Sequence, residues 1–469
     1  MKMIQYMLPA FTACILAGAC TKQLDQLPTT SKVGNQFFTT QNEAEEYISS
    51  VYGTLQRVGL YGQYLPVLAE ISSDNTWDQV PANDNGYAGQ LDLFTTIPSN
   101  GILSLNWSDS YVAIQRANVV LNRIDAVSYQ TDSVKTARKG AMKFVRALIY
   151  FNLVRTYGDV PLVTKETTNT NDYFGQGRTN KDTIYTQIVK DLKDAITALP
   201  AVADQKGGIV KTAAQALLGK VYLTLAQYPE AIAILNTVVN SGVHSLLSTP
   251  GSIFSLSNEL NAEIIFAVQF AAGVNGNTEG SPLQQQSSPS GFISGAKGHN
   301  LPTRYLYNMY SNADLRKGTY LDTTKQGVPY CKKYTANASN PTDGGSDFVV
   351  LRYADVLLML AEASNESGNT ADALTYLNKI RNRAGLTSFL IEDQTQIRNE
   401  ISLQRQLELV GEGHRWFDLL HTTDPVNTMN TYFKTTGQNI TIKDFNLLMP
   451  IPQDQVDTDP SIKQNTGYN

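Results

Sequence analysis

Apolar residues recur along much of the chain with the spacing of a helix. Between residues 141 and 148 they fall at i, i+3, i+4 and i+7, which places them on one helix face. These residues are Ala141, Phe144, Val145 and Leu148. Apolar residues also stand opposite that face, so we expect this helix to be buried nearly all round and to end at Gly158. Stripes with the same period at 214–225 and 353–361 predict a mainly helical protein.

An internal repeat indicates how these helices pair. The sequence PEAIAILN (229–236) returns later in the chain as ADALTYLN (371–378). Twelve residues before the alanine at the third position of each copy stands a small residue, Gly219 or Ala361. A small side chain there lets two antiparallel helices approach closely, and Leu235 fills the space left between them. This is the pattern of tetratricopeptide helix pairs.

The repeat and the polar segments between its copies define the expected domain organisation. We predict one all-α domain over 37–469, with tetratricopeptide-like helix pairs as its scaffold and little β structure. The pairs are expected near 141–240 and 352–384. Two insertions rich in Gly, Asn, Ser, Thr and Pro, at 72–101 and 272–304, are predicted to be structureless loops. Loops of this length in a compact protein are usually functional or disordered.

The N-terminus resembles a bacterial lipoprotein signal. A positive Lys2 precedes a mostly apolar stretch and small residues that end at Cys20. We expect 1–19 to be a signal peptide, Cys20 to carry lipid and 20–36 to be a tether. The alternative is a simple secreted protein in which this cysteine is coincidental. Once the signal is removed and Cys20 is acylated, Cys331 is the one cysteine left, so no internal disulfide is expected.

Composition narrows the classes of function. The net charge is −5, the isoelectric point is near 5.5, and 17% of residues are charged against about 25% in a typical domain. No basic block occurs, which argues against a nucleic-acid partner. No segment after the signal is apolar for the ~18 residues of a spanning helix, so membrane contact is expected through the lipid alone. The 24 tyrosines favour recognition of neutral, hydroxyl-rich ligands.

Motifs of catalysis and metal binding are missing from the sequence. It contains no G-x-S-x-G, H-E-x-x-H or P-loop motif, and its four histidines lack metal-ligand spacing. Nothing marks a pair of carboxylates as those of a glycosidase. A calcium loop at 74–86 is a weaker alternative, because the glycine and glutamate of an EF-hand are absent there. We therefore expect no catalysis and no cofactor.

Candidate ligand-binding residues lie in the two insertions. Sugar rings have apolar C–H faces that aromatic rings cover, and hydroxyls that Asn, Asp or His can bind. Trp77 is the leading candidate, because it stands in a polar loop rather than on an apolar helix. The full set is Trp77, Asp74, Asn75, Asn85, Tyr87, Phe292, His299 and Tyr305. Trp107 and Trp416 are instead expected in the core.

Five ordered motifs and the N-terminus carry a family resemblance. They are VRALIYFNLVRTYGDVPLV (145–163), RYADVLLMLAEASNESGNTADALTYLNKIRNRAGL (352–386), RQLELVGEGHRWFDLL (405–420), LMPIPQDQV (448–456) and DPSIKQNTGY (459–468). With the start CTKQLDQLP, the chain resembles the SusD/RagB family of Bacteroidetes outer-membrane lipoproteins. The resemblance implies a lipid-anchored protein that faces outward from the cell outer membrane.

The resemblance also implies a function and a partner. Family members bind nutrients, mostly glycans, and act as the lid of a SusC-like TonB-dependent transporter, without catalysis. Two alternatives stay open, a peptide-capturing lipoprotein of the same architecture and a protein-only tetratricopeptide adaptor. Charged residues in the shared motifs, among them Arg405, Glu408 and Glu412, are interpreted as buried ion pairs that lock helices together.

Overall fold

The computed structural model describes residues 38–274, 276, 279–334, 336–337 and 340–468. The predicted signal, Cys20 and the tether lie outside the described residues. Among the helices described, none combines the length and the hydropathy needed to cross a membrane.

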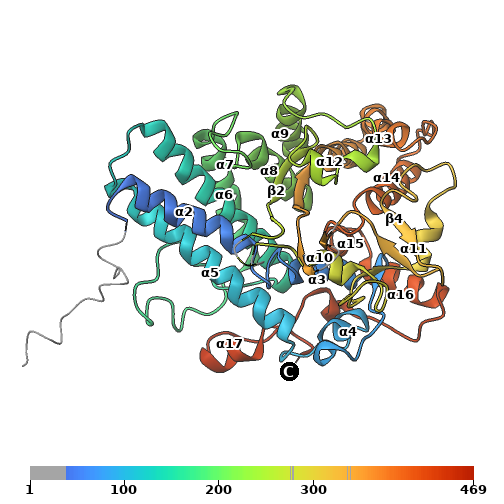
Figure 1. Cartoon of the computed structure of the whole chain (residues 1–469), viewed down its shortest axis with the longest axis horizontal. Coiled ribbons are helices and arrows are strands. Elements are labelled where there is room, and N and C mark those ends of the chain that lie inside the picture. Colours follow the sequence, from blue (N-terminus) through green and yellow to red (C-terminus); the bar gives the residue numbers. More distant parts are fainter. Residues whose placement is uncertain (1–37, 275, 277–278, 335, 338–339, 469) are drawn as a thin grey trace, which may run out of the picture.

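The longer helices of the N-terminal half pack on one another in chain order. They are α2 (Gln41–Leu55), α5 (Gly101–Arg123), α6 (Asp132–Tyr157), α7 (Lys181–Ala198), α8 (Lys211–Thr224) and α9 (Tyr228–Asn240). Figure 1 shows α2, α5, α6 and α7 side by side, with α8 and α9 continuing the stack. As predicted, the C-terminal part of α6 is buried both on its apolar stripe and on the opposite face. The helix ends at Gly158, also as predicted.

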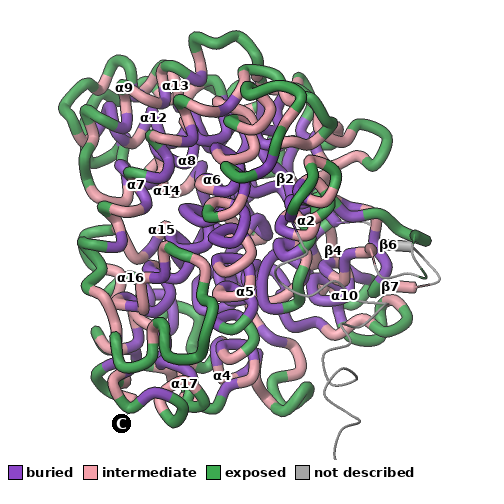
Figure 2. Tube along the Cα trace, turned by 90° about the vertical axis from the view of Figure 1, so that its left-hand side faces the viewer, coloured by how far each residue is buried: buried purple, intermediate pink, exposed green. Residues whose placement is uncertain are grey.

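Helices of the C-terminal half pack on the last helices of this stack. Its helices are α12 (Tyr353–Glu366), α13 (Thr370–Arg383), α14 (Gln394–Glu408), α15 (Arg415–Leu420), α16 (Pro425–Thr435) and α17 (Gln453–Thr458). Helix α12 packs on α9, α13 and α14. Figure 2 shows buried residues concentrated along α6, α8 and α12 in the interior.

Strands are few and short, which confirms the predicted fold class. They form antiparallel pairs: β1 (Thr76–Trp77) with β3 (Leu301–Pro302), β2 (Ile264–Val268) with β8 (Phe348–Arg352), β4 (Leu321–Thr323) with β5 (Pro329–Cys331), and β6 (Ala336–Asn337) with β7 (Asn340–Gly344). Short helices precede or follow several of them, namely α3 (Tyr64–Ile71), α4 (Tyr87–Asp92), α10 (Leu283–Ser287) and α11 (Arg304–Met309).

The two insertions are more ordered than the sequence predicts. The first contains β1 and α4, and the second contains α10 and β3. Pairing of β1 with β3 joins them, with Trp77 opposite Leu301. The prediction of structureless loops is therefore wrong, because hydrogen bonds between two segments distant in sequence supply order that neither segment has alone.

The close helix contact predicted from the repeat is present. A Cβ atom built on Gly219 of α8 would lie 2.3 Å from Cδ2 of Leu235 in α9. Both Leu235 and its counterpart Leu377 are fully buried. The glycine is thus required by close packing of the helices.

Gly219→Ala should lower the stability of the protein. The added methyl group overpacks the α8–α9 contact, at a cost of about 1–3 kcal/mol. Gly53→Ala is the matched control, because Gly53 is an exposed helix residue whose Cβ would meet nothing closer than 3.9 Å. Thermal unfolding should show a lower midpoint for Gly219→Ala and an equal or higher one for Gly53→Ala. Equal midpoints for Gly219→Ala and the unaltered protein would contradict the packing argument.

Candidate functional site

The two predicted insertions meet and form one surface. Beyond the β1–β3 pair, the Gln79 backbone N–H donates to the Gly298 carbonyl at 3.0 Å. The side-chain oxygen of Gln79 accepts from the Ser290 N–H at 2.8 Å. The segments around residues 79 and 290–298 are therefore held together by hydrogen bonds.

A third segment, the hairpin of β4 and β5, completes a cavity of about 470 Å³. Its lining includes Gln79, Pro289, Ser290, Phe292, Thr324, Lys325 and Gln326. The ring of Phe292 is 46% exposed and lies 4.9 Å from the ring of Tyr330, centroid to centroid. The arrangement places the exposed ring of Phe292, in contact with the half-buried Tyr330, beside amide, hydroxyl and ammonium groups. Such a surface can bind a ring that has apolar faces and polar edges.

His299 connects the two insertions instead of facing this cavity. It is buried, with Nδ1 2.9 Å from Asp78 Oδ1 and Nε2 3.1 Å from Asp84 Oδ2. Burial alone would lower the pKa of His299, but hydrogen bonds to the two carboxylates raise it above its ordinary value. His299, a predicted ligand-binding residue, therefore uses both ring nitrogens to contact carboxylates of the first insertion.

Asp74 and Asn75, two further predicted ligand-binding residues, are also buried. Both oxygens of Asp74 accept from Arg415, at 2.7 and 2.8 Å. The amide of Asn75 donates to Oε2 of the fully buried Glu70. Backbone N–H groups of Gly413 and His414 donate to the other oxygen of Glu70, at 2.9 and 3.1 Å. Asp74 and Asn75 therefore anchor the loop to the core.

The remaining candidates lie nearer the surface. Trp77 is half-buried, two residues before the cavity-lining Gln79, and Asn85 is exposed with a left-handed φ of 61°. Tyr87 is half-buried, and its ring lies against Gly101 at the start of α5. Tyr305 is half-buried with its ring 5.2 Å from that of Tyr432.

Sequence reasoning missed two residues that line the cavity and one aromatic ring beside it. Gln79 lay inside the insertion that held Trp77, yet its amide was not singled out. Tyr330 and Lys325 belong to the β4–β5 hairpin, and no local pattern links that hairpin to residue 292. A search for aromatic residues outside helical stripes could have found Tyr330.

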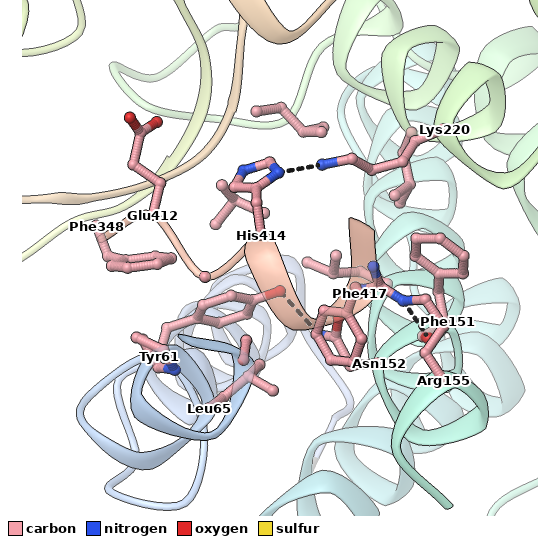
Figure 3. Close-up of a pocket in the computed structure, with 17 residues that line it drawn as sticks. Tyr61, Leu65, Phe151, Asn152, Arg155, Lys220, Phe348, Glu412, His414 and Phe417 are labelled. Atoms are coloured by element: carbon pink, nitrogen blue, oxygen red, sulfur yellow. Dashed lines mark hydrogen bonds between the residues drawn. The ribbon is translucent and has the colours of Figure 1, made fainter. Parts of the chain in front are cut away.

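A small internal cavity is lined by residues that stabilise the fold. Its volume is about 40 Å³, room for a few water molecules. Figure 3 shows Lys220 directed at His414, with Nζ 3.1 Å from Nδ1, and Arg155 beside Phe151 and Phe417. Burial, helped by the Lys220 ammonium, lowers the pKa of His414 to about 3, so the neutral ring accepts this hydrogen bond. These groups are paired with one another rather than presented to a ligand.

The charged residues of the C-terminal motifs form a buried ionic network, as the sequence predicts. Glu408 lies among three arginines, Arg316, Arg352 and Arg383. Burial alone would raise the pKa of Glu408, but these guanidinium groups hold it well below its ordinary value. Arg405 pairs in the same way with Asp355 and Asp418. Within the described residues, no group of three His, Cys, Asp or Glu side chains is arranged to hold a metal ion. Trp107 and Trp416 are buried in the core, as expected.

Comparison with known proteins identifies two family profiles that together span most of the chain. The SusD family matches residues 321–468, and the family described as "Starch-binding associating with outer membrane" matches 24–223. SusD-like protein P25 of Formosa agariphila is 26% identical over 96% of both chains. The "Laminarin binding SusD-like protein" of known structure is 26% identical, with a TM-score of 0.79 over 92% of this chain and 100% of that one.

A further structural neighbour shares the fold. It is surface glycan-binding protein A from Bacteroides thetaiotaomicron, whose structure holds laminarihexaose. The identity is 20%, and the TM-score is 0.77 over 91% of this chain and 100% of that one.

Glu408→Gln should strongly destabilise the protein. The change leaves three buried arginines short of a negative charge, at a cost of about 3–5 kcal/mol. Glu366→Gln is the matched control, because Glu366 pairs with the half-exposed Arg398 in a surface pair worth about 0–1 kcal/mol. Urea unfolding should separate the two variants clearly. Midpoints that fall by the same small amount would show that the buried network does not stabilise the fold.

Glu70→Gln should change how stability depends on pH. Burial raises the pKa of Glu70 to about 7. The folded protein therefore keeps this proton to about pH 7, while the unfolded chain releases it near pH 4.3. Stability must fall as pH rises through that window, and Glu70→Gln removes this contribution. Thermal unfolding at pH 5 and pH 8 should show the variant gaining stability at pH 8 relative to the unaltered protein.

The control for this measurement is Glu230→Gln, at an exposed position of α9. It should keep the pH profile of the unaltered protein. If Glu70→Gln keeps that profile too, the raised pKa of Glu70 is wrong.

Proposed function

The chain belongs to the SusD family, and from this premise we propose that it captures oligosaccharides at the cell surface and delivers them to a SusC-like TonB-dependent transporter. The observation that carries the proposal is the exposed ring of Phe292, in contact with Tyr330, at a cavity lined by residues of both loop insertions and of the β4–β5 hairpin. A relative of known structure is named for laminarin binding, which supports a glycan as the cargo.

The binding site that we propose combines this aromatic pair with polar neighbours. Phe292 covers the C–H face of a sugar ring, while Gln79 and Lys325 bind its hydroxyls. In this proposal Trp77, Asn85 and Tyr87 of the first insertion also contact the ligand. The hydrogen bonds between the two insertions hold the platform in place before ligand arrives, which lowers the entropic cost of binding. Asp74, Asn75 and His299 hold the loops and have no direct contact with ligand in this proposal.

Anchoring and release complete the proposed role. Cys20 carries the lipid that tethers the protein to the cell outer membrane, facing outward. Two or more acyl chains make such an anchor stable, whereas one chain holds weakly. Affinity should be modest, roughly −4 to −8 kcal/mol, because cargo must pass on to the transporter. The protein catalyses no reaction in this role.

Phe292→Ala should weaken glycan binding by about tenfold or more. Loss of a buried phenylalanine contact costs about 1.5–3 kcal/mol, and 1.4 kcal/mol is a factor of ten. Trp77→Ala tests the neighbouring loop in the same way. Native affinity electrophoresis of residues 21–469 in gels that contain laminarin, starch or other soluble polysaccharides measures the effect as loss of retardation.

Leu390→Ala is the control, because Leu390 is 80% exposed on the loop after α13, away from the cavity. It should leave retardation unchanged. Retardation that survives both aromatic substitutions would place the glycan elsewhere on the protein. If no polysaccharide retards the protein and peptides from a library bind to it, the peptide-capturing alternative is favoured.

A further inference from the structure

A second aromatic cavity lies on another side of the molecule. Its volume is about 490 Å³, within the range of about 300–1,000 Å³ typical of small-ligand pockets. It lies between α5, the loop that follows α6 and helix α17. In Figure 1, α17 lies beneath α5, whereas α11 and β4, beside the Phe292 cavity, lie at the other side of the molecule.

Aromatic rings form both the floor and the rim of this cavity. Trp107 and Tyr111 of α5 lie at the floor with ring centroids 5.3 Å apart. The Tyr111 hydroxyl donates to the Pro161 carbonyl at 2.7 Å, which fixes that ring. Tyr173 and Phe174 stand on the loop, and Phe174 is 60% exposed. Burying a phenylalanine ring is favourable in free energy, and a ring this exposed does not gain that free energy within the protein. A ligand that covers the ring would therefore bind favourably.

The loop that carries Phe174 is held rigidly. Its Thr167 exchanges two hydrogen bonds with the Gln115 amide of α5, each 2.9 Å long. The Gly175 N–H donates to Asp459 beside α17 at 2.8 Å. The rings are therefore positioned in advance, and a ligand does not have to order the loop.

The polar groups at this cavity select for a neutral ligand. Gln455, Thr170 and Thr458 line it and offer amide and hydroxyl groups. Asp459 contributes one carboxylate, and no lysine or arginine of the described chain is among the lining residues. An anionic ligand would meet a negative charge without a compensating cation, whereas a neutral, hydroxyl-rich ring finds both stacking surfaces and hydrogen-bond partners.

We propose that this cavity is a second binding site for neutral sugar rings, separate from the Phe292 cavity. This inference rests on the proposed function, because the ligand is again a glycan, but the residues that bind it are different. A long glycan can therefore be held by either site alone, and each site can fail without the other.

The three tryptophans of the chain provide an experiment that separates the two sites. Labelling residues 21–469 with 5-fluorotryptophan gives one fluorine resonance each for Trp77, Trp107 and Trp416. Trp107 lines the second cavity and reports on it, whereas Trp77 reports on the first insertion, two residues before the cavity-lining Gln79. The buried Trp416 is an internal control. Single Trp→Phe variants assign the resonances. Laminarihexaose and maltohexaose, followed by other neutral hexasaccharides, are the titrants.

We expect a hexasaccharide to shift the Trp107 resonance. Phe174→Ala should weaken that titration at least tenfold and leave the Trp77 titration within twofold. Phe292→Ala should do the reverse. Because Phe174 is exposed, its loss should not affect folding, and an unchanged Trp416 resonance checks this.

Each other result has a distinct meaning. A Trp107 resonance that no hexasaccharide moves overturns the second site, whether or not Trp77 responds. A Trp107 shift that Phe174→Ala leaves unaltered overturns it as well. A response of Trp77 alone supports the proposed function without the second site, and a response of Trp107 alone supports the second site against the first.

Discussion

Arg352 lies fully buried among three glutamates, and the rest of the structure is organised around it. Its guanidinium group contacts Glu263, Glu408 and Glu412 at 2.7 to 2.9 Å. These residues come from the segment before β2, the last turn of α14 and the turn before α15. A buried charge without its partner is far costlier than a paired one. The three segments must therefore assemble together, which explains why charged residues occupy the interior of this helical protein.

The ionic network extends to the candidate site through one short turn. Glu412 begins the turn, and the next two backbone N–H groups donate to Glu70 at the end of α3. Glu70 in turn accepts from Asn75, just before Trp77. The loop that supports the site is thus connected to the core by consecutive hydrogen bonds. This connection gives the loop a fixed position, although the residues after it are polar and exposed.

The surface cavities beside Phe292 and Phe174 are built in the same way. Each places an exposed phenylalanine on a loop whose polar groups bond to neighbouring segments, so the ring is presented without a flexible arm. They differ in charge, because Lys325 lines the first and Asp459 lines the second. A lysine and an aspartate differ by two unit charges, so the two cavities favour ligands with different substituents.

The sequence by itself determined the helices, the contact of Gly219 with Leu235 and the structural character of the charged motifs. These depend on periodicity and spacing within one or two helices, which a linear pattern records. It also predicted the two insertions, which the structure joins through β1 and β3. Only the tertiary structure decided which of their side chains face outward. Asp74 and His299 are buried against Arg415 and Asp78, which lie on segments distant in sequence, and Asn75 is buried against Glu70, five residues before it. Tyr330 contacts Phe292 because the two segments that carry them pack together. A contact between distant segments leaves no local pattern in the sequence.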